Sequence, residues 1–265
     1  MNLDEKYLNQ LNDYCKTTYF DEIPGAGDIV FLKITLESLY FPLNLTKAQR
    51  RDEFLEEMLA PKTVGTQGSI NKDQQYRRVI VGDPGCGKTT FCKRICLAYA
   101  HSELENLKYT VRDGDTIKKY SLPEGAFPVL LTCRTLNAAE LEPEPDFYQI
   151  AYRITREMFP ELDFSCDQFK EMLQAKEKTA AGLMIIVDGL DELLDEGLPD
   201  VFSNAFCKYI DSGLRPDKTS GRNFIATVRS ASAANAEKLQ RLRDAQTYQI
   251  APLTDSEVGD FCRTW

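Results

Sequence analysis

The sequence of 265 residues contains a single histidine, His101, and this scarcity excludes several kinds of site. A zinc site of the Cys/His type needs more imidazoles than the chain offers, and no C-x-x-C pair is present to compensate. A Ser/His/Asp hydrolase would have to use His101, but the G-x-S-x-G turn that presents such a serine is missing. The chemistry of this protein must therefore rest on other residues.

Basic charge and long apolar runs are also scarce. Lys and Arg number 32 against 41 Asp and Glu, so the formal net charge is −9 at pH 7. This balance disfavours broad electrostatic binding to nucleic acid, which requires a basic surface. No apolar run approaches the ~18 residues of a membrane-spanning helix, and the polar, acidic start of the chain does not resemble a secretory signal. We expect neither a membrane nor a nucleic acid as partner.

The cysteines show no pattern of pairing. Eight of them are spread from Cys15 to Cys262. We expect them to be free thiols, mostly buried, because a free cysteine packs like a small apolar residue. Reduced thiols in a chain without a secretory signal are typical of the cytoplasm, where we expect this protein to be located.

The most informative stretch is the octet GDPGCGKT from Gly82 to Thr89, which matches the phosphate-binding pattern G-x-x-x-x-G-K-[ST]. It lies between a short apolar run and an amphipathic segment that begins near Lys88. Its glycines let successive backbone N–H groups converge on an anion, and the positive end of the following helix points to the same place. Lys88 is expected to contact the β- and γ-phosphates, and the Thr89 hydroxyl to take one position on Mg²⁺. The predicted nucleotide-contacting residues are Gly82, Asp83, Pro84, Gly85, Cys86, Gly87, Lys88, Thr89 and Thr90.

Strands and helices alternate from this motif onward. The expected core strands are residues 77–82, 127–133, 183–187, 223–228 and 247–250. The expected helices are residues 88–100, 146–159, 167–176, 198–210 and 235–242, with a last one from residue 255. This order predicts an α/β protein with the P-loop NTPase fold, in which a parallel five-stranded core sheet is covered by helices on both faces. Ligands of such sheets bind at the carboxyl ends of the strands.

Residues 1–70 are predicted to form a small α/β lead-in module packed on the core, and residues 71–265 the nucleotide-binding domain. The expected elements of the lead-in are a helix over 3–15, a strand over 29–36, a helix over 46–59 and a polar linker over 61–73. Within the larger domain, Asp113-Gly114-Asp115 predicts a β-hairpin inserted over residues 108–120.

A second group of candidate residues follows the apolar strand over 183–187. Asp188 is expected to hold Mg²⁺, directly or through water, next to Thr89. Glu192 is our candidate for the group that orients or deprotonates the attacking water, and Asp191 for its structural or metal-side partner, although acidic residues are also favoured at any helix start. Arg229 ends the next strand, where a guanidinium could bind the γ-phosphate and distinguish ATP from ADP. The predicted catalytic residues are Lys88, Asp188, Asp191, Glu192 and Arg229, and the predicted Mg²⁺ ligands are Thr89 and Asp188.

Four segments resemble the NACHT family of signal-transduction ATPases, within the class of STAND NTPases. They are VIVGDPGCGKTTF, FPVLLTCRTLN, LMIIVDGLDEL and FIATVRS. The third carries the most information, because a small residue directly after the metal-binding aspartate, followed by an acidic pair, is the variant of this motif found in that family. The resemblance covers roughly residues 30 to 265 and implies adenine nucleotides as ligands. The extended run over residues 39–43 is expected to contribute to the purine pocket.

The resemblance implies a nucleotide-dependent switch with slow Mg²⁺-dependent ATP hydrolysis. Members of the family hold ADP or ATP, couple exchange to opening, and self-associate to activate an effector, in prokaryotes in antiviral or innate immune defence. Sensor and effector domains are not recognisable in this chain, which stops at Trp265 inside an expected helix. We therefore expect a piece of a longer protein.

Three alternatives remain open. An AAA+-like mechanical ATPase would need a ring-interface arginine and a sensor helix beyond residue 265. A binding-only domain would hold ADP without turnover. A small-molecule kinase fits less well, since no acceptor-binding lid is evident in the sequence.

Overall fold

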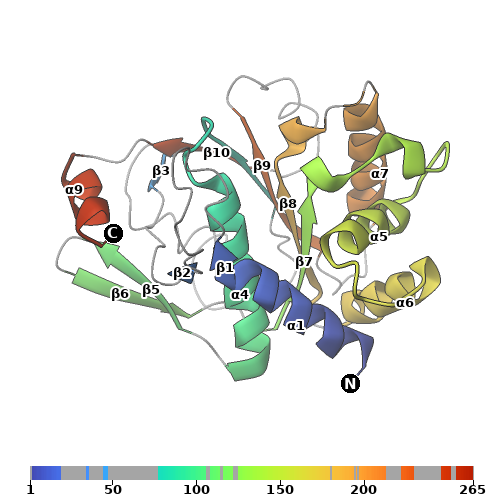
Figure 1. Cartoon of the computed structure of the whole chain (residues 1–265), viewed down its shortest axis with the longest axis horizontal. Coiled ribbons are helices and arrows are strands. Elements are labelled where there is room, and N and C mark those ends of the chain that lie inside the picture. Colours follow the sequence, from blue (N-terminus) through green and yellow to red (C-terminus); the bar gives the residue numbers. More distant parts are fainter. Residues whose placement is uncertain are drawn as a thin grey trace, which may run out of the picture.

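The computed structural model describes residues 2–18, 34–35, 44–46, 77–105, 108–113, 116–121, 125–179, 181–193, 195, 197–212, 222–229, 246–251 and 255–264. The described part is a mixed α/β structure built around a parallel sheet, as the sequence predicted (Figure 1). Three predicted segments lie outside the described residues: the linker over 61–73, the run over 39–43 and the helix over 235–242.

The central sheet has the strand order β3-β10-β4-β9-β8-β7. Its strands are β3 (Asn44–Thr46), β10 (Gln246–Ala251), β4 (Arg77–Val81), β9 (Arg222–Val228), β8 (Leu183–Asp188) and β7 (Phe127–Thr132). Neighbouring strands are parallel, except that β3 pairs antiparallel with β10. β7 and β8 are buried along their whole length, which explains their continuous apolar sequences.

Helices cover the sheet on both faces. They are α4 (Lys88–Glu105), α5 (Phe147–Met158), α6 (Cys166–Glu177) and α7 (Leu198–Ser212). α4 connects β4 to β7 in one direction across the sheet, whereas α5 and α7 lie in connections that lead back toward β9. Because such crossovers are right-handed, α4 and the pair α5 and α7 lie on opposite faces. Capping boxes at Asp146 and Ser165 fix where α5 and α6 begin.

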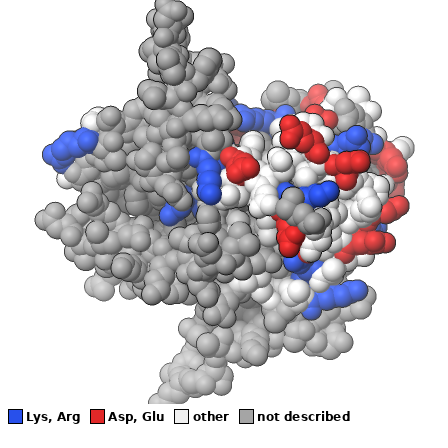
Figure 2. Space-filling model, turned by 60° about the horizontal axis from the view of Figure 1, so that its bottom comes forward, with Lys and Arg blue, Asp and Glu red and all other residues white. Residues whose placement is uncertain are grey.

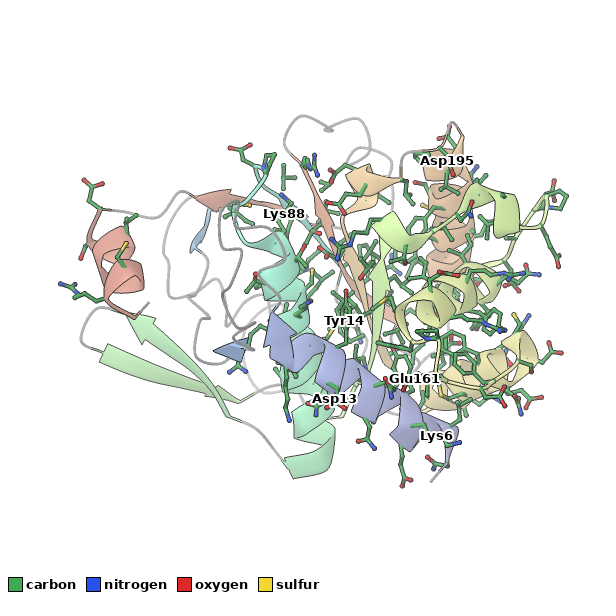
Figure 3. The ribbon with its side chains drawn as sticks, in the orientation of Figure 1. Lys6, Asp13, Tyr14, Lys88, Glu161 and Asp195 are labelled. Atoms are coloured by element: carbon green, nitrogen blue, oxygen red, sulfur yellow. The ribbon has the colours of Figure 1, made fainter. Side chains whose placement is uncertain are left out.

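Helix α1 (Leu3–Lys16) belongs to the same hydrophobic core as the sheet. The Tyr7 ring stacks on Phe127 of β7 with ring centroids 5.5 Å apart, and its hydroxyl accepts the Leu130 N–H at 3.3 Å. β7 is an edge strand, so this bond pairs a backbone donor that would otherwise face outward. Tyr14 meets Phe159 edge-on from the same helix, which lies across the lower half of α4 in Figure 3.

The remaining described elements are small. They are β1 (Thr17–Thr18) paired with β2 (Ile34–Thr35), the hairpin β5 (Lys108–Asp113) with β6 (Thr116–Ser121), three 3₁₀ turns η1 (Cys133–Thr135), η2 (Ala138–Glu140) and η3 (Leu190–Glu192), and α9 (Asp255–Thr264). The hairpin confirms the prediction from Asp113-Gly114-Asp115. Thr46, the expected start of a helix, is instead the last residue of β3, because it pairs with Gln249 of β10. The rest of that expected helix lies outside the described residues.

Across the described ranges, no helix combines the length and the apolar character needed to cross a membrane. Acidic and basic side chains are interspersed over the described part of the face shown in Figure 2.

Candidate functional site

Strand β4 leads into a sharply curved loop, residues 82–87, which we call the glycine loop. Gly85 and Gly87 have φ of 77° and 91°, a region that side chains rarely adopt. At Gly82, a Cβ atom would lie 2.7 Å from Cys86 Sγ and 2.9 Å from Ile250 Cδ1, so a larger residue would displace its neighbours. Glycine is therefore required at three positions for two different reasons, and the curvature leaves the backbone open to close approach by an anion.

The Lys88 ammonium is folded back onto the glycine loop at the N-terminal end of α4 (Figure 3). Its Nζ donates to Gly82 O at 2.7 Å and to Asp83 O at 2.8 Å, and it lies 3.8 Å from Cys86 Sγ. The first bond of the α4 ladder joins the Phe91 N–H to Gly87 O at 2.9 Å. The amides of residues 88–90 therefore precede the ladder, and a helix end of this kind attracts anions.

Strand order brings the other candidate residues to the same edge of the sheet. β9 lies between β4 and β8, and the Gly82 N–H donates to Val228 O at 3.1 Å. Arg229 directly follows this acceptor. Asp188 ends β8, the next strand of the sheet, so the glycine loop, Asp188 and Arg229 all lie at the carboxyl ends of neighbouring strands.

Asp188 is buried, with 4% of its surface exposed, and its carboxylate is hydrogen-bonded to Thr227 of β9. The Thr227 hydroxyl donates to Asp188 Oδ1 at 3.1 Å and accepts the Gly189 N–H at 2.9 Å. Sequence reasoning missed Thr227. The available signal was a polar residue inside the apolar run over residues 224–228, two positions before Arg229.

Arg229 is clamped by the acidic pair that follows Asp188. Its Nε lies 2.8 Å from Asp191 Oδ2, and its backbone N–H donates to Asp191 Oδ1 at 2.8 Å. Its Nη2 reaches Glu192 Oε1 at 3.2 Å. The Asp191 side chain is only 2% exposed, whereas 45% of Arg229 and 32% of Glu192 remain exposed. Asp191 is thus the fixed end of the clamp, and Glu192 is the accessible end.

Gly189 makes room for this arrangement. Its φ is 73°, and a Cβ atom there would lie 2.9 Å from both Cδ and Oε2 of Glu192. The Glu192 carboxylate therefore folds over the backbone of Gly189, a position open to it only while residue 189 has no side chain.

Buried thiols line the inner side of the site. Burial raises the pKa of Cys92 on α4, and the nearby Asp188 carboxylate raises it further. Burial also raises the pKa of Cys133, with smaller contributions from Asp188, Glu192 and Asp191. These two thiols stay protonated at neutral pH. All eight cysteines are free, as predicted, but only four are buried: three are half-buried and Cys262 is exposed.

Comparison with known families assigns part of the chain. The family model described as nephrocystin 3, N-terminal, matches residues 67–226, more than half of the sequence. The chain belongs to the nephrocystin 3 N-terminal family. No curated protein matches the chain.

The segment matched by the nephrocystin 3 N-terminal family contains the glycine loop, Lys88 and the run from Asp188 to Glu192. It ends at residue 226, one position before Thr227, so Thr227 and Arg229 lie outside the match, whereas Asp191 and Glu192, the partners of Arg229, lie inside it. The structure nevertheless joins both parts through the bonds of Arg229 and Thr227.

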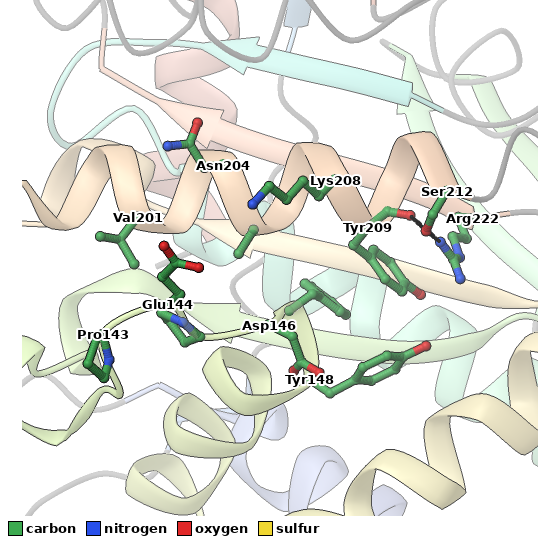
Figure 4. A pocket seen from close by; sticks show the side chains of 13 residues that line it. Pro143, Glu144, Asp146, Tyr148, Val201, Asn204, Lys208, Tyr209, Ser212 and Arg222 are labelled. Carbon is green, nitrogen blue, oxygen red and sulfur yellow. Dashed lines mark hydrogen bonds between the residues drawn. The ribbon is translucent and has the colours of Figure 1, made fainter.

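A separate hollow of about 540 Å³ lies between the segment over residues 143–148 and helix α7 (Figure 4). Arg222, the first residue of β9, lines it, so this hollow is at the opposite end of that strand from Arg229. None of the predicted nucleotide-contacting residues lines it.

Proposed function

We propose that this member of the nephrocystin 3 N-terminal family binds ATP and ADP with Mg²⁺ at the carboxyl edge of its sheet. The observation that carries the proposal is the glycine loop joined to α4, with the Lys88 ammonium held against the loop carbonyls. A cation, converging amides and a helix N-terminus at one point form an arrangement suited to a phosphate chain. In this proposal the core is a P-loop NTPase fold with five parallel strands.

The residues of the edge fit a metal–nucleotide complex better than a metal alone. No group of three or more His, Cys, Asp or Glu residues that could hold an ion occurs in the described part of the chain. Thr89, exposed on the first turn of α4, and the buried Asp188 would supply the protein's share of the ligands. Mg²⁺ is commonly held by one or two protein groups together with phosphate oxygens, and when bound it neutralises charge on the phosphates.

The remaining proposed roles belong to the clamp. Arg229 would leave Glu192 to contact a γ-phosphate, and Glu192 would then be free to orient or deprotonate a water molecule. While Glu192 is paired with Arg229, its Oε1 is held by the guanidinium and is not directed at a water molecule. Hydrolysis in this proposal is therefore slow, because it requires the ion pair to open first.

Slow turnover suits a regulatory role. We propose a NACHT-type signalling NTPase of the STAND class, acting in the cytoplasm as a nucleotide-dependent switch that self-associates in its ATP state, in antiviral or innate immune defence. The support is the pattern LMIIVDGLDEL together with the pairing of its acidic residues to Arg229.

One observation favours a second candidate, a binding-only nucleotide domain. Glu192, the proposed base, is already paired with Arg229 at 3.2 Å. Glu192→Gln separates the two candidates, because it should abolish residual ATP hydrolysis in a switch and change nothing in a domain that never hydrolyses ATP.

The decisive experiment is a measurement of nucleotide content and exchange on the purified protein. We expect the wild type to bind ADP and ATP and Lys88→Ala to lose at least about 100-fold in affinity, since charge-assisted contacts to phosphate are strong. Lys178→Ala, at an exposed lysine, is the matched control. If the wild type binds neither nucleotide, or if Lys88→Ala binds as well as the control, the proposal is wrong.

A further inference from the structure

Thr227 makes contacts that set it apart from the other residues of β9. Its side chain is fully buried. Its strand, β9, lies between β4, which leads into the glycine loop, and β8, which ends with Asp188. Its single hydroxyl both donates to Asp188 Oδ1 and accepts the Gly189 N–H. The hydroxyl thus donates its proton to Asp188 and accepts from the turn that follows, and it also interacts with the buried Cys92 thiol.

A buried carboxylate needs such a partner. Removing an ionised group from water is costly unless hydrogen bonds or opposite charges compensate. A hydroxyl bonded to one carboxylate oxygen also restricts the rotation of the whole group. The bond to Gly189 fixes the backbone at the same point, where φ is 73° and the chain turns away from the strand.

A second buried threonine shows that this arrangement is specific. Thr155 of α5 is as completely buried as Thr227, yet its Oγ1 has no hydrogen-bond partner among the described residues. Burial of a threonine in this protein therefore does not by itself imply a role for its hydroxyl.

We infer that Thr227 is a positioning residue for the metal ligand Asp188. It holds the carboxylate in one orientation, so that little ordering is required when Mg²⁺ and nucleotide bind. This inference rests on the proposed function, because it needs Asp188 to be a ligand. Residues that orient metal ligands in this way commonly account for 10- to 100-fold of metal affinity.

The test measures two affinities in each variant: ADP without metal, and Mn²⁺, as a spectroscopic substitute for Mg²⁺, for the protein–ADP complex. We expect Thr227→Val to weaken Mn²⁺ binding at least about tenfold and to leave metal-free ADP binding within about twofold. Thr227→Ser, which keeps the hydroxyl, should restore Mn²⁺ affinity. In an Asp188→Asn background, Thr227→Val should have no further effect, because it acts through the carboxylate.

Thr155→Val is the matched control, since it removes a buried hydroxyl that has no hydrogen-bond partner within the described ranges. If Thr227→Val loses its cooperative thermal transition, the comparison of Thr227→Ala with Thr227→Ser takes its place. The inference is overturned if Thr227→Val binds Mn²⁺ like the control, or if it weakens metal-free ADP binding as much as it weakens Mn²⁺ binding. If the wild type binds no nucleotide under either condition, the proposed function itself fails and this inference fails with it.

Discussion

The two ends of strand β9 each carry an arginine paired with carboxylates, but the pairs differ in burial. At the amino end, Arg222 and Glu177 are 14% and 11% exposed, with Nη2 of the arginine 3.2 Å from Oε2 of the glutamate. At the carboxyl end, Arg229 is 45% exposed, and only Asp191 of its two partners is buried. One strand thus joins a closed ionic cluster to an open one.

The partners of the two arginines explain this difference. Glu177 also accepts hydrogen bonds from the hydroxyls of Tyr148 and Tyr209. Arg222 also donates to Tyr209 O, and it donates to Ser212 Oγ (Figure 4). Arg229 has its two acidic partners, and one of these, Glu192, is reachable from solvent. The closed cluster holds α6, α7 and β9 together. In the proposed function, the open one would exchange a carboxylate for a phosphate of the nucleotide.

The largest effect on stability is therefore expected at the amino end. Glu177→Ala leaves Arg222 in a buried position without its carboxylate and should lower the free energy of unfolding by about 3 kcal/mol. Urea denaturation monitored by circular dichroism measures this. Glu171→Ala, at an exposed position of the same helix, should change it by less than about 0.5 kcal/mol. Equal effects of the two variants would contradict the assignment of a closed cluster.

Much of the fold and part of the candidate site could be predicted from the sequence, for two reasons. The glycine loop and the strands over 127–132 and 183–188 could be predicted because local patterns determine them: glycine spacing in one case, and apolar runs in the others. Asp188 and Arg229 could be placed at the carboxyl edge because parallel strands end together.

The hydrogen bonds across the strands could not be predicted in this way. The bond from Thr227 to Asp188 depends on which strand lies beside β8, and the sequence does not state that β9 separates β8 from β4. The amphipathic face of α1 was predicted, but its partner, Phe127 of the edge strand, depends on the same unknown order. The resemblance to the NACHT family and the roles of the acidic pair stay predictions.

At the open end, we expect the next largest effect from Gly189→Ala. A φ of 73° costs a non-glycine residue about 1–2 kcal/mol, and the new methyl group would also displace Glu192. Gly197→Ala has a similar φ of 81°, but none of the residues that the structure describes comes within 4 Å of the added Cβ. Both variants should lose stability in urea denaturation, and only Gly189→Ala should also change ATP hydrolysis. If Gly197→Ala changes hydrolysis as much, displacement of Glu192 is not the cause.

Arg229→Ala should have a small effect on stability and a larger effect on the preference for ATP over ADP. The arginine is half-exposed, and the backbone N–H that Asp191 accepts is kept in any substitution by alanine. The loss in free energy of unfolding should be about 1 kcal/mol or less. Affinity for ATP should fall about tenfold, as expected for a lost charge-assisted bond, and affinity for ADP should stay within about twofold. Isothermal titration with each nucleotide measures this, and an equal loss for ADP and ATP would rule out a contact to the γ-phosphate.

The smallest expected effect is on how the free energy of unfolding depends on pH. It concerns the amino end of β9 only, because the closed cluster there contains tyrosines. Burial raises the pKa of Tyr209 above its usual value of 10.0, and the neighbouring Glu177 carboxylate raises it further. As pH rises toward 10, this tyrosine releases its proton in the unfolded chain but keeps it in the folded one. The unfolded state then binds fewer protons, so stability falls, by about 0.4 kcal/mol per such tyrosine between pH 9 and pH 10. Tyr209→Phe, referenced to its own stability at pH 7, should make this decline shallower in urea denaturation. An unchanged slope would mean that the closed cluster does not keep the phenol protonated, and that the two ends of β9 differ less than their burial indicates.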